Sequence, residues 1–285
     1  MEHTRRAATT RLSPRVRRSG ASARVVPKLP VLPGAPDLMA YYRTLSESLG
    51  PMHWWPAKTP FEVIVGAILT QSTAWSNVEL AIANLRRERL LTFAALERVP
   101  IRQLERLVRP SGYFRQKALK LKAFVAFVRN EFGGSLGRMF RTPTAELRER
   151  LLRVHGIGPE TADSILLYAG GHAVFVVDAY TQRMLGRHGI TGSHNAAAAR
   201  NPNYEDVRGL IEARLDRDAR LYNEFHALIV NAGKNWCRKR EPRCAECPLH
   251  DFLPPDSPLR SRAARAVPPI VSAQSQLLVP SESSL

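Results

Sequence analysis

The 285-residue chain carries 42 Lys and Arg residues against 25 Asp and Glu residues, a formal net charge of +17. This excess favours a polyanionic partner, although a demand for solubility also explains part of it. No apolar run is long enough to cross a membrane, and the arginine-rich start lacks the apolar stretch of a secretory signal. We therefore expect an intracellular monomer, cytoplasmic or in the nucleoid, whose three cysteines are not paired as disulfides.

Both ends of the chain have a biased composition. Residues 1–36 are rich in Arg, Ser, Ala and Pro, and the first 28 residues hold eight basic residues and one acidic residue. This pattern predicts a disordered basic arm followed by a proline-rich linker. Such an arm adds salt-sensitive DNA affinity, or is an inert tail or a transit peptide. Residues 254–285 have low complexity and are predicted to be a disordered tail.

Helical periodicity runs through most of the chain between these ends. The predicted helices cover residues 37–49, 61–85 (as a pair), 92–109, 114–132, 144–152, 159–170, 179–188, 204–215 and 218–232. Residues 133–143 and 191–203 are predicted loops, and the apolar run 174–177 is too short to change the class. The sequence therefore predicts an all-α fold.

The predicted helix over residues 114–132 carries four basic residues. Arg115, Lys117, Lys120 and Lys122 are expected to form a basic face that contacts a nucleic-acid backbone. Tyr113, at the turn before this helix, is expected to pack against the protein interior.

Residues 145–170 show the pattern of helix, tight turn and helix. Gly156, Ile157 and Gly158 allow a sharp turn, and Pro159 suits the first position of the second helix. A turn of this kind points backbone N–H groups outward at a helix start, where they bind phosphate. The apolar run 174–177 then delivers Asp178 to the start of the next helix. Asp178 is a candidate catalytic group, with simple capping of that helix as the alternative.

The hairpin, the glycine- and proline-containing loop and Asp178 together resemble the helix-hairpin-helix DNA glycosylases of the endonuclease III superfamily. The resemblance spans residues 41–252 and implies a two-lobed helical glycosylase domain over residues 37–235. It implies that Gly156, Ile157 and Gly158 hold phosphates of damaged double-stranded DNA, and that Asp178 assists cleavage between base and sugar. It also implies that Gln71 enters the DNA stack as a wedge; bonding a helix end is the alternative role.

Glu160 departs from one branch of this family. Enzymes that also cut the DNA backbone use a lysine two residues after the second hairpin glycine to form a Schiff base. Glu160 occupies that position here, and a carboxylate cannot form an imine. The departure predicts a monofunctional glycosylase, unless another lysine acts instead.

Adjacent tryptophans precede the predicted helix pair, and a third tryptophan follows Gln71 by four residues. They either pack as core or form an aromatic wall that stacks a flipped base. Their pattern is similar to the 3-methyladenine glycosylase branch, which also has a lysine at the pocket edge. An N-alkylated purine is cationic, so it is a good leaving group and is attracted to indole rings. The predicted base pocket consists of Trp54, Trp55, Pro56, Trp75 and Lys234. A second lysine of that branch is replaced by Leu228.

Three cysteines lie in residues 236–253 with the spacing Cys237-x6-Cys244-x2-Cys247. The spacing resembles the family's iron–sulfur loop, in which a fourth cysteine follows five residues later; Leu253 stands there. Four thiolates normally hold a 4Fe–4S cluster, whereas His250 offers a fourth ligand for zinc. A degenerate metal-free loop, a cluster with an unusual ligand and a zinc site all remain open. No cofactor is expected to be required for the chemistry.

Two other functions fit the same residues. One is a bifunctional glycosylase and lyase acting on oxidised pyrimidines, which Glu160 and the tryptophan pair oppose. The other is a non-catalytic DNA-binding module, which Asp178 opposes.

Overall fold

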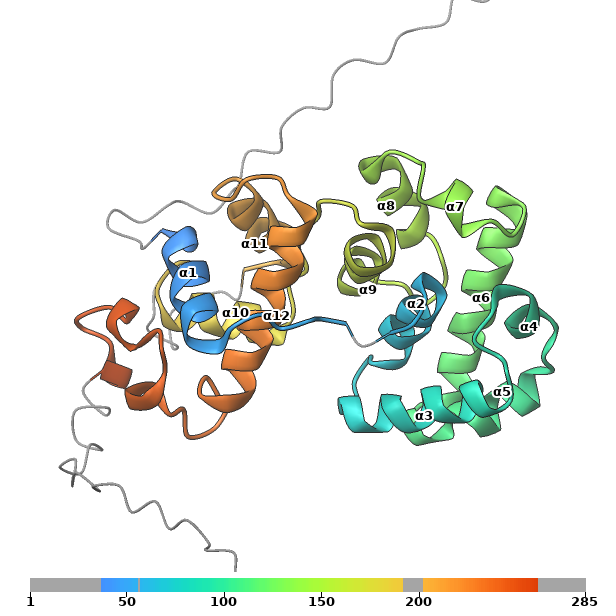
Figure 1. The fold of residues 1–285 in the computed structure, drawn as a ribbon, viewed down its shortest axis with the longest axis horizontal. Coiled ribbons are helices and arrows are strands. Elements are labelled where there is room, and N and C mark those ends of the chain that lie inside the picture. The colour runs from blue at the N-terminus through green and yellow to red at the C-terminus, as the bar shows by residue number, and fades with distance from the viewer. Residues whose placement is uncertain (1–36, 56, 192–201, 261–285) are drawn as a thin grey trace, which may run out of the picture.

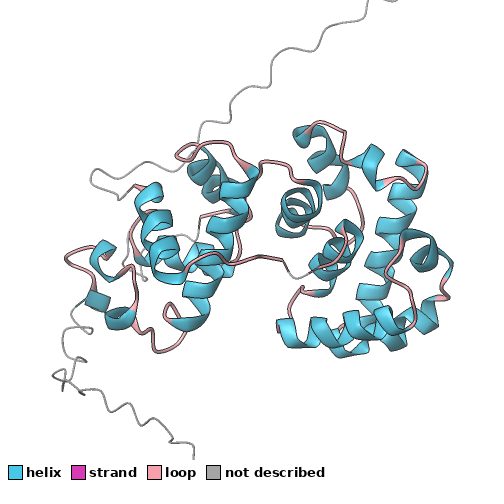
Figure 2. Ribbon diagram, viewed as in Figure 1, coloured by secondary structure: helices cyan, strands magenta, loops and turns pink. Residues whose placement is uncertain are grey.

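The structure is a computed structural model that describes residues 37–55, 57–191 and 202–260. The predicted basic arm, Pro56 and most of the predicted tail lie outside these ranges. Within them all regular structure is helical, which confirms the predicted all-α class. Figures 1 and 2 show the helices gathered in two lobes joined near α9 and α12.

The larger lobe is formed by the consecutive helices between residues 60 and 164 (Figure 1). Thr59 caps α2 by accepting a hydrogen bond from Glu62 N, and Pro60 occupies its first turn. All residues of α2 from Phe61 to Leu69 are buried, so this helix forms the centre of the lobe. The helices are α2 (Pro60–Leu69), α3 (Trp75–Arg87), α4 (Phe93–Arg98), α5 (Ile101–Val108), α6 (Phe114–Phe132), α7 (Leu136–Met139), α8 (Thr144–Leu152) and α9 (Pro159–Ser164).

The smaller lobe is formed by the first described helix together with the helices that follow residue 178. It contains α1 (Leu38–Leu49), α10 (Ala179–Arg187), α11 (Tyr204–Glu212) and α12 (Ala219–Asn235), with short turns η3 (Cys244–Glu246) and η4 (His250–Phe252). α1 packs against α12, and α12 packs against α10. The lobe therefore depends on both ends of the described chain.

Two predicted boundaries were wrong. The predicted helix 92–109 is two helices, α4 and α5, because Pro100 has no N–H to continue the first and disfavours a helical conformation of Val99. The predicted loop 133–143 contains the short helix α7, which Ser135 caps by accepting a hydrogen bond from Arg138 N. α9 also continues into one wide turn, η2 (Ile165–Ala169), before the chain becomes extended.

The basic face predicted on α6 was wrong for Lys117 and Lys122, whereas Arg115 is exposed and Lys120 is half-buried. Lys117 is 2% exposed, and its Nζ donates to the carbonyl oxygens of Leu69 and Ser111 at 2.8 and 2.5 Å. Lys122 Nζ donates to the carbonyl oxygens of Leu96 and Glu97 at 2.9 and 2.7 Å. These ammonium groups satisfy helix-end carbonyls inside the lobe, so they are not a free surface charge. None of the described helices has the length and hydropathy needed to cross a membrane.

Candidate active site

Asp178 lies where the extended segment 174–177 meets α10. Its Oδ1 accepts a hydrogen bond from Thr181 N at 2.8 Å, so it does cap the helix as the simpler interpretation expected. The second oxygen, Oδ2, points elsewhere and lies 3.7 Å from Nε2 of His226. The side chain is 14% exposed, so the carboxylate is sheltered but still reachable. Capping and a chemical role are therefore compatible, because they use different oxygens.

Side chains of α11 hold the segment that leads to Asp178. Glu212 Oε1 accepts a hydrogen bond from Phe175 N at 2.9 Å, and the Tyr204 hydroxyl accepts one from Val177 N at 3.3 Å. These N–H groups belong to alternate residues and so point to the same side of an extended chain. Helix α11 thus provides the acceptors that a neighbouring strand would provide in a sheet.

A buried ion pair connects this arrangement to the hairpin. Asp163 of α9 is fully buried, and Arg148 of α8 donates to its two oxygens at 2.6 and 3.0 Å. The Tyr204 hydroxyl also donates to Asp163 Oδ2, at 2.9 Å. Burial raises the pKa of Asp163, and the Arg148 guanidinium opposes that rise. Two helices of the hairpin and one helix of the smaller lobe are therefore fixed to one carboxylate.

A groove of about 670 Å³ runs beside the hairpin. Gln71, Tyr113, Lys120, His155 and Glu160 are among its lining residues. Tyr113 is 73% exposed with φ of 42°, so the expectation that it packs inward was wrong. The aromatic ring instead stands at the rim of the groove.

Glu160 lies in this groove at the position discussed above for a lysine. Its side chain is open to the groove, yet the surrounding protein and then the nearby Asp178 raise its pKa to about 7. A carboxyl group with this pKa is partly protonated near neutral pH. The site thus contains two carboxyl groups in different environments, a common arrangement for separate acid and base roles.

Gln71 contacts the hairpin directly. Its Nε2 donates to Gly156 O and Thr161 Oγ1 at 3.0 and 2.9 Å, and its Oε1 accepts from Lys120 Nζ at 2.5 Å. Gly156 has φ of +79°, and a Cβ there would lie 2.3 Å from Lys120 Cγ, so glycine is required twice over. Ile157 is buried, which leaves only the backbone of the turn available to a ligand.

The predicted tryptophans form one aromatic cluster. The Trp55 ring lies 5.0 Å from the Trp75 ring and 5.2 Å from the Tyr168 ring, measured between centroids. Trp54 meets Trp55 edge to face at 6.1 Å, and Lys234 Nζ lies 5.8 Å from the Trp54 centroid. Trp55 also packs on Gly66 of α2, where a Cβ would meet its ring at 3.0 Å. The sequence pattern had grouped these side chains; Pro56 lies outside the described residues.

Two residues beside Asp178 were not among the predicted site residues. Tyr168 of η2 and His226 of α12 are joined by a hydrogen bond of 2.6 Å between the hydroxyl and Nδ1. The His226 ring is 4% exposed and lies 6.4 Å from the Trp54 ring, between centroids. Both residues lie on mostly apolar helices, so no local pattern distinguishes them from core residues. They are distinguished from core residues only by the side chains that lie next to them in the folded protein.

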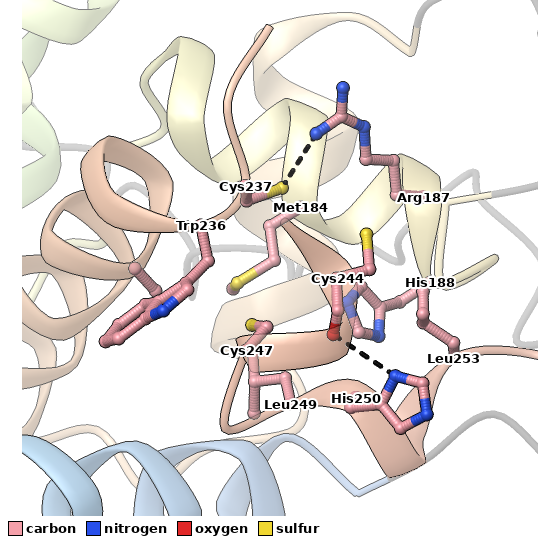
Figure 3. Close-up of a pocket in the computed structure, with 11 residues that line it drawn as sticks. Met184, Arg187, His188, Trp236, Cys237, Cys244, Cys247, Leu249, His250 and Leu253 are labelled. Carbon is pink, nitrogen blue, oxygen red and sulfur yellow. Dashed lines mark hydrogen bonds between the residues drawn. The ribbon is translucent and has the colours of Figure 1, made fainter. Parts of the chain in front are cut away.

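The cysteine loop lies at the far end of the smaller lobe, and Figure 3 shows its three thiols around a small cavity. Leu253 lines the same cavity and is 3% exposed, so an apolar side chain fills the position of the fourth ligand. Cys237 Sγ accepts a hydrogen bond from Arg187 Nη1 at 3.2 Å. His250 Nδ1 contacts the carbonyl oxygen of Cys244 at 3.1 Å.

These residues do not fit a four-thiolate cluster. In the described ranges, no group of three or more His, Cys, Asp or Glu side chains is arranged to hold a metal ion. Burial raises the pKa of Cys247 to about 11 and also raises that of Cys244, so both side chains are thiols in the metal-free protein.

Comparison with known proteins places this architecture in a family. Residues 65–208 match the model of the HhH-GPD superfamily of base excision DNA repair proteins. The chain is 42% identical over 213 residues to a candidate DNA repair glycosylase of Methanocaldococcus jannaschii, covering 74% of this chain and 93% of that relative. It is 26% identical over 193 residues to endonuclease III of Sulfolobus acidocaldarius, covering 67% and 80% of the two chains.

Solved structures agree with this placement. The 3-methyladenine DNA glycosylase of H. pylori, bound to 1,N6-ethenoadenine, shares 27% identity with a TM-score of 0.60, covering 70% of this chain and 98% of that one. An endonuclease III–DNA complex, at 19% identity and a TM-score of 0.64, has the same fold over 79% and 97% of the two chains. The chain belongs to the HhH-GPD superfamily, and it is a DNA glycosylase of base excision repair.

Proposed function

We propose that this glycosylase is monofunctional and removes N-alkylated purines of the 3-methyladenine type from double-stranded DNA. The observation that carries the proposal is that Asp178 lies near enough to Glu160 to raise its pKa, beside an indole cluster and without a lysine at the hairpin position. Asp178 has a free oxygen to stabilise positive charge on the sugar or to activate water as the base leaves. An alkylated purine already carries the charge that weakens its glycosidic bond.

The aromatic cluster supports the choice of a cationic base. Trp54, Trp55 and Trp75 offer large π faces, and a cation over an indole gains more when it is desolvated. The H. pylori relative is named for 3-methyladenine and is bound to 1,N6-ethenoadenine, which supports a modified adenine as the substrate. Lys234 stands at the exposed edge of the cluster, where it contacts Trp54.

The remaining roles follow from the groove. The backbone of Gly156, Ile157 and Gly158 would hold a phosphate, and Gln71 would fill the space of the extruded base. Gln71 has three hydrogen bonds to the hairpin and Lys120 in this DNA-free structure, so a wedge role requires it to exchange them for contacts with DNA. We propose that the chemistry requires no metal and that a monomer acts on the damaged duplex.

One observation would also fit a lyase activity. Lys117 and Lys120 line the same groove, and burial lowers the pKa of Lys117 to about 8, as a Schiff-base lysine would need. Their ammonium groups, however, bond Leu69 O, Ser111 O and Gln71 Oε1. A monofunctional reaction is therefore favoured, and trapping with borohydride tests it.

The deciding experiment measures base release from methylated duplex DNA, with strand breaks scored before and after alkali. We expect free 3-methyladenine, breaks only after alkali and no borohydride-trapped protein–DNA adduct. Breaks without alkali together with an adduct would show a lyase. Release from oxidised but not methylated DNA would assign the other substrate class. Iron and zinc analysis of the same preparation, with its visible spectrum, distinguishes the three states of the cysteine loop.

A further inference from the structure

His226 has an unused nitrogen beside the proposed catalytic carboxylate. Its Nε2 is buried and has no hydrogen-bond partner among the described residues, and the nearest charged atom is Asp178 Oδ2 at 3.7 Å. Buried polar atoms are nearly always paired, so an unpaired one at a reaction site requires an explanation. A distance of this size is also common before substrate tightens the hydrogen bonds of a site.

The other ring nitrogen is held by Tyr168. Burial and the nearby Asp178 raise the pKa of Tyr168 well above its usual value, so the phenol keeps its proton. Burial lowers the pKa of His226, so the imidazole is neutral and carries a single N–H. The remaining question is which nitrogen carries it.

The neighbours at both ends of the pair select the same tautomer. The indole N–H of Trp54 faces the Tyr168 oxygen and lowers its pKa, without meeting hydrogen-bond geometry. A donor on that side leaves the phenol proton to be donated to His226 Nδ1 over 2.6 Å. The imidazole proton then lies on Nε2, which faces the Asp178 carboxylate. An N–H facing a carboxylate is also the favourable electrostatic arrangement.

We propose that His226 is a positioning residue for Asp178, with Tyr168 fixing its tautomer so that Nε2–H points at Oδ2. The proposal rests on the proposed function of Asp178. The Thr181 N–H then holds Oδ1 and the His226 Nε2–H holds Oδ2, so donors from two helices set the plane of the carboxylate. Such control matters because a misplacement of about 1 Å at a reacting group costs roughly 100-fold in rate.

A second pair of the same kind provides a matched control. Tyr41 and His188 are both buried, and the hydroxyl lies 3.0 Å from Nδ1. Neither ring nitrogen of His188 is among the buried polar atoms without a hydrogen-bond partner, and the backbone of Phe252 opposes the lowering of the His188 pKa by burial. This pair lies beside the cysteine loop, where His188 lines the cavity of Figure 3.

The test compares His226→Asn, His226→Gln and His188→Asn in the full chain. Asn keeps a polar group near Nδ1 and removes the one at Nε2, whereas Gln places an amide near Nε2. We measure single-turnover base release from methylated duplex, the Kd for a duplex with a tetrahydrofuran abasic analogue, and Tm. His226→Asn should slow release about 30- to 100-fold, with Kd changed about twofold or less, and Gln should recover most of the rate. His188→Asn should leave the rate unchanged.

Three results would overturn the proposal: a wild-type rate for His226→Asn, equal losses for Asn and Gln, or an equal loss for His188→Asn. Asp178→Asn is measured in parallel. If Asp178→Asn is as active as wild type, the proposed function of Asp178 fails; if it is inactive while His226→Asn is fully active, only the present proposal fails. A nitrogen-15 NMR spectrum of the imidazoles tests it without any substrate: a neutral Nδ1–H form of His226 would refute it.

Discussion

The protein holds two buried tyrosine–histidine pairs that differ in what the second ring nitrogen meets. In Tyr41–His188 one ring nitrogen contacts the tyrosine hydroxyl, neither ring nitrogen is a buried atom without a partner, and burial lowers the pKa of the imidazole to about 4. In Tyr168–His226 one nitrogen remains unpaired and faces Asp178. The residue types are the same in both regions. The two pairs differ in the surroundings of the second ring nitrogen and not in the kind of side chain, which is why we propose a positioning role for His226 and none for His188.

Among the variants that test this comparison, Asp178→Asn is expected to lower the rate of base release most. Asparagine still caps α10, so the change removes the charge and leaves the helix start intact. We expect base release to fall about 10³-fold, as when other preorganised charge-stabilising groups are removed. Asp218→Asn is the matched control, because Asp218 caps α12 in the same way by accepting hydrogen bonds from Arg220 N and Leu221 N. Single-turnover release and Tm check both, and equal losses would contradict the assignment.

Tryptophans offer the second comparison. Trp55 lies in the aromatic cluster, whereas Trp236 lines the cavity of the cysteine loop. Trp55→Leu should slow excision about 30-fold, since base–aromatic stacking is worth roughly 1–3 kcal/mol. Its affinity for undamaged duplex should change much less. Trp236→Leu should lower Tm without slowing excision; similar kinetic losses in both variants would argue against a base-stacking role for Trp55.

A third comparison is between the buried ion pair Arg148–Asp163 and the exposed ion pair Arg243–Glu246. Asp163→Asn leaves Arg148 in a mostly buried position, so unfolding free energy should fall by about 3 kcal/mol. Glu246→Gln breaks an exposed pair with Arg243, which water and salt screen, so the unfolding free energy should change much less than in Asp163→Asn. Urea unfolding of the two variants measures both values. A small loss for Asp163→Asn would mean that its ion pair does not hold the hairpin to α11.

The smallest effect is a pH dependence from Glu160. Its pKa is raised from 4.5 to about 7 in the folded protein, so the native state binds its proton more tightly than the unfolded chain. Wild-type stability must therefore fall as pH rises through this window. Glu160→Gln should remove the fall, so its advantage over wild type grows between pH 4.5 and 7 and is constant above.

We expect an advantage of about 1 kcal/mol or less, because the side chain is open to water that screens the interaction. Thermal unfolding across pH measures it. Glu149→Gln, at an exposed carboxylate of α8, is the control, and an identical trend in both variants would refute the Glu160 assignment.

Much of the fold was predictable because helical periodicity is a local signal. α1, α6 and α8 begin within a residue of their predicted starts, where Asp37, the Gly112 turn and Pro143 mark the boundary. The hairpin and Asp178 were predictable because glycine, proline and a capping carboxylate have short-range meaning. The division of the predicted helix 92–109 at Pro100 could have been predicted from the same rules.

The rest of the site depends on contacts between distant segments. Tyr168 and His226 are 58 positions apart and meet only when η2 packs on α12. Lys117 resembled a surface lysine because its acceptors, Leu69 O and Ser111 O, are brought to it by packing. Tyr113 resembled a core aromatic residue because its left-handed backbone conformation cannot be predicted from the residue type. No periodicity encodes such pairings.

The hydrogen bonds from α11 to the extended segment 174–177 also set an order of events during synthesis. The hairpin emerges from the ribosome before residue 170, but the N–H groups of Phe175 and Val177 find their acceptors only once Tyr204 and Glu212 have been made. The lobe that contains Asp178 is completed later still, when α12 packs against α1. A nascent chain therefore contains its hairpin well before the residues that hold the segment leading to Asp178, so the proposed catalytic carboxylate is fixed late in synthesis.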